Sequence, residues 1–244
     1  MTPVSSSIIL STATSSAPDT VAGVPVALRV HPRARRLKLR FDEKSGGLTL
    51  TVPPRTSRRA ALAWAAEQQS WVEAQLALQP VAIPLVPGAM IPLEGEEVEL
   101  SWVEGASRTV VREAASLRCG GPRESFGTRI EAWLKRLARD RLSAETREIA
   151  AAAGVSVRAV SVGDAGSRWG SCSAAGAIRY SWRLVLAPPE VRRFVVAHEV
   201  AHRLHMDHGP RFRAEEARLY GQPVAPARLL LRRLGPVIRR VGRG

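Results

Sequence analysis

The sequence predicts an α+β protein in which a smaller β-hairpin and helix region precedes a larger region with a mixed sheet and several helices. Residues 37–52 contain two runs that alternate apolar and polar side chains, which is the period of half-buried strands. Apolar residues recur at helical spacing through 126–153, and a further alternating run at 178–186 leads into a helical stripe at 188–202. Together, these patterns indicate the α+β class.

The composition indicates a globular protein of a reducing compartment. A chain of 244 residues with 45% hydrophobic residues can bury a core without disulfides, and two cysteines are too few for a disulfide framework. No basic segment precedes the apolar cluster at 8–10, and four prolines interrupt the apolar stretch at 76–93. We therefore expect a cytoplasmic protein with no secretory signal and no membrane insertion.

The chain is strongly basic. Its formal net charge is +14, and all but three of its 36 basic residues are arginine. Such a bias often reflects a GC-rich genome, but the excess charge still creates a field that attracts polyanions. We expect an Arg-rich surface that suits nucleic acid or an acidic protein, although no zinc finger or other familiar nucleic-acid motif accompanies it.

Four segments are predicted along the chain. Residues 1–24 are rich in Ser, Thr and Ala without a steady period, and we expect a disordered tail. A Cys-Gly-Gly-Pro break at 119–122 separates a β-rich region with one tryptophan-bearing helix, at 25–118, from the larger region at 123–225. Residues 226–244 are expected to form a basic C-terminal helix or tail.

The first region begins with a hairpin whose strands lie at 37–41 and 48–52. Its basic face is interpreted as a solvated sheet face, with a phosphate-facing surface as the alternative. Ser57 should cap a helix that runs to about Leu78, in which tryptophans at seven-residue spacing belong to the core. Short strands follow at 91–93, 97–103 and 109–112.

The second region has the clearest patterns of the chain. A long amphipathic helix is expected at 126–153, where the next residue is a glycine that ends it, and a strand at 155–162. A further strand is expected at 178–186. The run Pro188-Pro189-Glu190 then opens a helix, because proline suits the first helical turn, and a short helix follows at 212–220.

Four of the five histidines lie between residues 198 and 208. His198 and His202 are four residues apart, so on a helix both imidazoles leave one face, about 6 Å apart along the axis, and can converge on one ion. Glu199 projects from the adjacent flank. This is the HExxH pattern of zinc hydrolases, in which the glutamate is the general base.

A catalytic zinc usually has three protein ligands. His208 is the favoured third ligand, because five residues separate it from His202, enough for the chain to leave the helix and return to the metal. His205 is the main alternative, although it would place three ligands in one row on a continued helix. Glu215 and Glu216 are weaker alternatives. The metzincin pattern is rejected, because a histidine replaces its glycine and no Met-turn follows.

Several neighbouring residues have candidate roles. With three histidines bound, zinc would lower the pKa of its water to about 7, and Glu199 would pass the proton to the leaving amine. His205 or Asp207 could fix the orientation of a ligand histidine. The candidates for stabilising the oxyanion are Arg168, Tyr180 and Tyr220. Cys172 is expected to be a buried thiol, neither a ligand nor a nucleophile.

Five motifs occur together, namely RWGSC at 168–172, YSWRL at 180–184, APP at 187–189, HEVAH at 198–202 and HMDHGPRF at 205–212. This series closely resembles the YgjP-like metallopeptidase family, which is related to the SprT-like and WLM zinc peptidases. The similarity is strong over about 155–220 and extends more loosely back to about residue 28. Asp-His-Gly at 207–209 replaces a more usual Asn-His-Ser, and Arg213 stands where Trp is common, but neither removes an expected ligand.

The resemblance implies a zincin-like fold with one zinc ion on His198, His202 and His208 and with Glu199 as the catalytic residue. It also implies that the RWGSC segment packs beside the site. The leading expectation is therefore a zinc-dependent metallopeptidase with a peptide or protein substrate, which can pair with a strand edge beside the metal.

Two alternatives remain open. One is a nucleic-acid-associated protein, for example a peptidase that acts on DNA-bound proteins as SprT-like relatives do. The other is a metal-stabilised binding module without turnover, in which zinc supports folding and Glu199→Gln changes no activity. An accidental HExxH is disfavoured by His208 and by the helix break after it.

Overall fold

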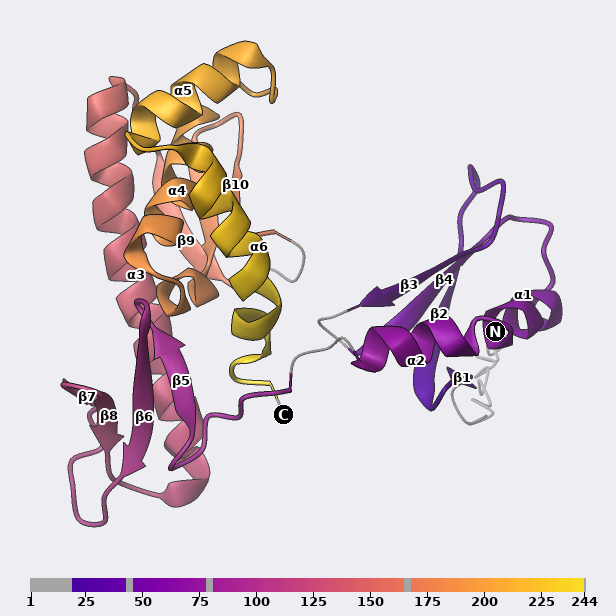
Figure 1. The fold of residues 1–244 in the computed structure, drawn as a ribbon, viewed down its shortest axis with the longest axis horizontal. Coiled ribbons are helices and arrows are strands. Elements are labelled where there is room, and N and C mark those ends of the chain that lie inside the picture. Colours follow the sequence, from indigo (N-terminus) through magenta and orange to yellow (C-terminus); the bar gives the residue numbers. More distant parts are fainter. Residues whose placement is uncertain (1–18, 43–45, 78–80, 165–167, 244) are drawn as a thin grey trace, which may run out of the picture. The chain divides into compact units, whose positions relative to one another are not determined.

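The computed structural model of the chain describes residues 19–42, 46–77, 81–164 and 168–243. The chain divides into two compact units, Met1–Gln79 and Pro80–Gly244, each with its own strands and helices (Figure 1). This division falls earlier than the break at 119–122 that composition suggested, because the strands within 90–119 share a hydrophobic core with the rest of the larger unit. The α+β class is confirmed by the mixture of small sheets and helices.

The smaller unit is a four-stranded sheet that packs against two helices (Figure 1). Its elements are β1 (Thr20–Val21), β2 (Val24–Val30), β3 (Lys38–Asp42), β4 (Gly47–Val52), α1 (Arg58–Ala66) and α2 (Gln69–Ala77). The strand order is β1-β2-β4-β3. The predicted hairpin is β3–β4, and β2 joins it by pairing parallel to β4, which the periodicity did not predict.

Two expectations for this unit are corrected. The expected tail is structured at its described end, where β1 forms because Val21 and Val24 are buried, whereas residues 1–18 lie outside the described part. Ser57 caps α1 as predicted, its side chain accepting a hydrogen bond from the Ala60 N–H. The helix nevertheless ends after one short run and a second helix follows, because the Gln68 N–H bonds only three residues back.

The larger unit contains two sheets in its described residues. The first is formed by β5 (Met90–Leu93), β6 (Glu96–Trp102), β7 (Val111–Glu113) and β8 (Ser116–Cys119), in the order β5-β6-β8-β7. The second is formed by β9 (Ala159–Gly163), β10 (Gly170–Cys172) and β11 (Ala177–Ser181), in the order β10-β11-β9. The short strand β10 is therefore an edge of its sheet.

Between these sheets in the chain runs α3 (Phe126–Ala153), preceded by a 3-10 turn, η1 (Arg123–Ser125). The predicted helix is confirmed at both ends. Gly154 ends it in the left-handed conformation at φ 66°, which glycine adopts without steric cost. The strand expected at 155–162 begins only at Ala159.

The strand expected at 178–186 is shorter than the alternation suggested. The strand β11 ends at Ser181, and the 3-10 helix η2 (Trp182–Leu186) follows. All five residues of η2 are buried, including Arg183, which hydrogen-bonds to Asp164 and to the carbonyl of Val241. The alternation of apolar and polar residues at 178–186 therefore does not reflect a strand with one solvent-exposed face.

Three helices complete the unit, α4 (Pro189–Ala201), α5 (Pro210–Tyr220) and α6 (Val224–Arg240). Helix α4 packs against α3, α5 and α6 and against β10. The basic C-terminal segment is mostly helical, and it belongs to the core of the unit through Ala227 and Ile238. In the part of the chain that the structure describes, no helix has the length and apolar character needed to cross a membrane.

Candidate metal centre

Helix α4 carries His198 and Glu199 into the centre of the larger unit. The helix begins with Pro189 and buries most of its residues, so its position is set by the core around it. It ends at Ala201, and the His205 N–H bonds back to the Ala201 carbonyl. The Arg203 and Leu204 N–H groups bond only three residues back, so the regular helix ends here, and the loop that follows brings His208 to His198 and His202.

His198, His202 and His208 converge, each offering one ring nitrogen within 4.8 Å of the others. The Nε2 atoms of His198 and His208 are 3.4 Å apart. A tetrahedral zinc ion with Zn–N bonds of 2.0–2.1 Å requires neighbouring nitrogens about 3.3–3.4 Å apart. The spacing of these two nitrogens therefore fits two positions of such a site, and the cluster is the one candidate of this kind among the described residues.

Hydrogen bonds on the outer ring nitrogens orient two of these histidines. Nδ1 of His198 lies 2.7 Å from Oε1 of Glu216, and Nδ1 of His202 lies 3.0 Å from the backbone carbonyl of His205. A carbonyl oxygen can only accept, so the proton of neutral His202 must sit on Nδ1. The Nε2 lone pair is then available to a metal ion.

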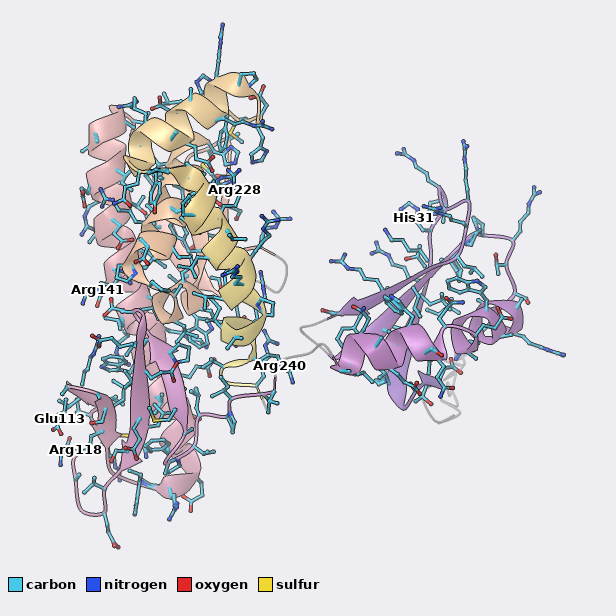
Figure 2. All side chains as sticks on the ribbon, viewed as in Figure 1. His31, Glu113, Arg118, Arg141, Arg228 and Arg240 are labelled. Atoms are coloured by element: carbon cyan, nitrogen blue, oxygen red, sulfur yellow. The ribbon has the colours of Figure 1, made fainter. Side chains whose placement is uncertain are left out.

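Glu216 of α5 is almost fully buried, with 2% of its side chain exposed. Its second carboxylate oxygen accepts a hydrogen bond of 2.8 Å from Arg228 of α6, which is labelled in Figure 2. Burial by itself raises the pKa of Glu216, but the hydrogen bond with His198 and the charge of Arg228 outweigh it, and the pKa is lowered. Glu216 is therefore an anion that orients the His198 ring through Nδ1. In this arrangement it contacts a ligand histidine, whereas the sequence had suggested it as a metal ligand itself.

Glu199 is also buried, with 4% exposed. Its carboxylate packs against Gly170 of the edge strand β10, where an added Cβ would come within 2.5 Å of Oε1. Burial raises the pKa of Glu199 to about 7, although His198 and Arg168 act in the opposite direction. The RWGSC segment thus lies beside the candidate general base, and its glycine provides the room that the carboxylate occupies.

Sequence reasoning missed Phe212 as a member of the site. Its ring centroid is 5.0 Å from His198, 4.5 Å from His202 and 4.7 Å from His208, and the residue is 1% exposed. Phe212 and Glu216 are four residues apart on α5, so both face the histidines. A glutamate at the same helical spacing as buried apolar residues was the signal that could have identified this face.

Two predicted neighbours of the ligand histidines have different contacts. His205 reaches the centre through its backbone carbonyl on His202, as described above, and not through its ring. Asp207 accepts a hydrogen bond from the Gly209 N–H through Oδ1, which shapes the turn before α5. The loop between α4 and α5 therefore positions His202 and His208 through its backbone conformation.

Of the predicted oxyanion residues, two are in the core. Tyr180 is completely buried, and its hydroxyl lies 3.0 Å from Oγ1 of Thr146, with burial raising its pKa. Tyr220 is 5% exposed and packs edge-on against Phe194. Arg168, by contrast, is exposed, and its charge lowers the pKa of Glu199. Tyr180 is therefore enclosed with its hydroxyl on Thr146, and the oxyanion role of Tyr220 stays a prediction.

Cys172, which was expected to be a buried thiol, is half-buried on β10. Burial is the largest influence on its thiol and raises its pKa, so the thiol is protonated near neutral pH.

Comparison with known proteins places these residues in a family. The YgjP-like metallopeptidase domain matches residues 35–233, whereas searches of curated proteins and of solved structures gave no match. A metallopeptidase domain implies a metal ion and a peptide or protein substrate, and the three histidines can hold such an ion. Because the match spans most of the chain, this protein belongs to the YgjP-like metallopeptidase family, as its motifs predicted.

Proposed function

We propose that this metallopeptidase uses one zinc ion held by His198, His202 and His208, with Glu199 as the general base. The observation that carries the proposal is the 3.4 Å separation of the His198 and His208 Nε2 atoms beside a buried glutamate of the same helix. Three neutral imidazoles are a common ligand set for catalytic zinc, and they leave a fourth position for water or substrate.

Glu199 would transfer one proton, from the attacking water to the leaving nitrogen. A bound zinc ion supplies a Lewis acid that polarises the scissile carbonyl. Glu199 takes a proton from the attacking water as the new carbon–oxygen bond forms, and it delivers that proton to the leaving nitrogen as the carbon–nitrogen bond breaks. Without a metal ion, burial raises the pKa of Glu199 to about 7, and the charge of a bound zinc ion would favour the ionised carboxylate that a general base requires. Arg168 is the predicted oxyanion residue that we retain, because it is exposed and influences Glu199.

The edge strand β10 supports an extended substrate. It pairs with β11 on one side, it ends the sheet, and α4 packs beside it. A peptide can add to such an edge through main-chain hydrogen bonds. Since Gly170 of β10 contacts Glu199, a peptide aligned there would bring its backbone close to the base.

The variant Glu199→Gln tests this mechanism. We expect it to keep near-stoichiometric zinc, because the three histidines remain, and to hydrolyse labelled casein about 10²–10⁴-fold more slowly. Glu190→Gln, an exposed change on the same helix, is the matched control and should match wild type. An unchanged rate in Glu199→Gln would exclude the proposed base. Loss of folding on zinc removal, with no hydrolysis by either protein, would support the binding module instead.

A further inference from the structure

The sheet of the smaller unit is covered by helices on one face. Alternate residues of its strands, including Leu48 and Leu50, pack with Ala61 and Ala65 of α1 in one hydrophobic cluster. The positions between them face the opposite side, because successive strand residues point to opposite faces. On that side lie Arg29, Lys38, Arg40, Thr49 and Thr51, which together are called the open sheet face.

The strand register places cations on both sides of a central pair of threonines. Thr51 of β4 is opposite Arg29 of β2 and Lys38 of β3, and Thr49 is opposite Arg40. With strands about 4.8 Å apart and about 3.4 Å per residue, Arg29 and Lys38 are about 10 Å apart at the backbone. Lys38 and Arg40 are about 7 Å apart. On the open sheet face, three cationic side chains therefore surround two threonine hydroxyls.

The strand directions bring further arginines to one end of the open sheet face. Because β2 is parallel and β3 antiparallel to β4, the end of β2, the start of β3 and the end of β4 coincide. The loop from β2 to β3 carries Arg33, Arg35 and Arg36, and the loop from β4 to α1 carries Arg55, all exposed. In Figure 2 nitrogen-tipped side chains extend into solvent around His31, which lies in the first of these loops.

These cations are not neutralised within the described part of the smaller unit. Among the described residues of this unit, no ion pair or hydrogen bond involves the side chains of Arg29, Arg33, Arg35, Arg36, Lys38, Arg40 or Arg55, although the Arg33 backbone N–H donates to Nδ1 of His31. In the larger unit, by contrast, Glu94 alone contacts three arginines. Among the described strand residues, Asp42 is the acidic residue on the same side of the sheet as the open sheet face. It lies at the opposite end of β3 from the basic loops.

We propose that the open sheet face and its basic loops bind the phosphate backbone of nucleic acid. The guanidinium fork of arginine can donate two parallel hydrogen bonds to a phosphate, and threonine hydroxyls also donate to phosphate oxygens. No aromatic side chain lies on this face in the described residues, since Phe41 and Trp64 belong to the covered cluster. Bases therefore have no stacking platform, and recognition is through the backbone without sequence preference.

The same face is poorly suited to other polyanions. Protein interfaces concentrate aromatic and apolar residues at their centre, and basic membrane-binding surfaces insert large apolar side chains. Among the described strand residues, the apolar members of the open side are Pro25 and Ala27, which offer little surface of either kind. The open sheet face instead presents positive charges and hydroxyl groups, which are complementary to the negatively charged oxygens of a phosphodiester chain.

The test compares two triple variants of the full chain. Arg29→Gln/Lys38→Gln/Arg40→Gln changes the open sheet face, and Arg136→Gln/Arg139→Gln/Arg147→Gln removes the same charge from exposed positions of α3. Binding to a labelled mixed-sequence DNA duplex of about 20 base pairs is followed by anisotropy between about 50 and 200 mM salt. We expect the first variant to bind at least about tenfold more weakly, with a salt slope smaller by about 3, and the control to match wild type.

Further measurements identify the ligand and guard against misfolding. Arg29→Lys/Arg40→Lys keeps the charges, so it should retain most of the salt slope, whereas a folding defect would lower binding in both face variants. Single-stranded DNA and duplex RNA distinguish the form of nucleic acid. No binding of wild type at 50 mM salt, equal weakening in both triple variants, or tighter binding to polyglutamate or anionic vesicles would overturn the proposal. Casein hydrolysis does not enter this test, so it can fail independently of the metal centre.

Discussion

The Nδ1 atom of His198 lies 2.7 Å from Oε1 of Glu216, which connects the metal-site helix to the helix after it. The other oxygen of Glu216 accepts from Arg228, so the contact runs through α4, α5 and α6. A buried carboxylate is costly unless it is paired, and here both oxygens have partners. The His198 ring is therefore oriented by the fold, with its other nitrogen directed toward His208.

Glu216→Gln should weaken zinc binding about 10–100-fold, because an amide removes the negative charge that raises the basicity of His198. The affinity is measured by competition with a chromophoric chelator. Glu215→Gln is the matched control, since Glu215 bonds to Arg218 and not to a histidine. Equal affinity in the two variants would show that Glu216 stabilises the fold without tuning the metal centre.

His208→Ala should lose near-stoichiometric zinc, because its Nε2 is one of the two nitrogens at tetrahedral spacing. His205→Ala should keep the metal, since the contact of His205 with His202 is made by the backbone carbonyl. Metal analysis of the two purified variants distinguishes them. Retention by His208→Ala with loss from His205→Ala would transfer the third ligand to His205.

Local patterns were enough to predict much of the larger unit and the candidate ligands. Gly154 ends α3 and Pro189 opens α4, and both effects depend on the backbone preference of one residue. The histidine pair is also local, because helical geometry brings residues at i and i+4 to one face. Features that depend on residues close together in the chain, such as helix ends and the histidine pair, can therefore be predicted from the sequence.

Features that depend on distant packing could not be predicted in this way. The parallel pairing of β2 with β4 joins segments whose own patterns say nothing of their partner. Helical spacing places Glu216, unlike its neighbour Glu215, on the same face of α5 as Phe212, but only the packing of α5 on α4 brings its carboxylate to His198. The residues 182–186 alternate in sequence, yet burial on all sides turns them into η2.

Gly170→Ala should slow hydrolysis about 10²-fold while leaving zinc bound. The added Cβ would come within 2.5 Å of Oε1 of Glu199, so the carboxylate must move, and a displacement of about 1 Å costs a rate of this order. Ser171→Ala, the next position of β10, is the control and should retain activity. The readouts are kcat, zinc content and melting temperature. A fall in activity that merely follows a fall in melting temperature would assign Gly170 to the fold alone.

Glu199 should make the stability of the metal-free protein depend on pH. Burial raises its pKa from the ordinary value of 4.5 to about 7, with His198 and Arg168 opposing this. Between these values the folded protein keeps a proton that the unfolded chain has released. Folding free energy therefore becomes less favourable as pH rises from about 4.5 to about 7, and it does not change further above that. The shift corresponds to about 3 kcal/mol.

Glu199→Gln removes this titration, so the metal-free variant should be more stable than metal-free wild type by about 3 kcal/mol at pH 8. The difference should shrink to below about 1 kcal/mol at pH 5, where the buried carboxyl of wild type is protonated. Urea unfolding of chelator-treated proteins at both pH values measures it, with Glu190→Gln as the exposed control. An advantage of Glu199→Gln that is equal at pH 5 and pH 8 would mean that packing is responsible, and that burial does not hold the proton on Glu199.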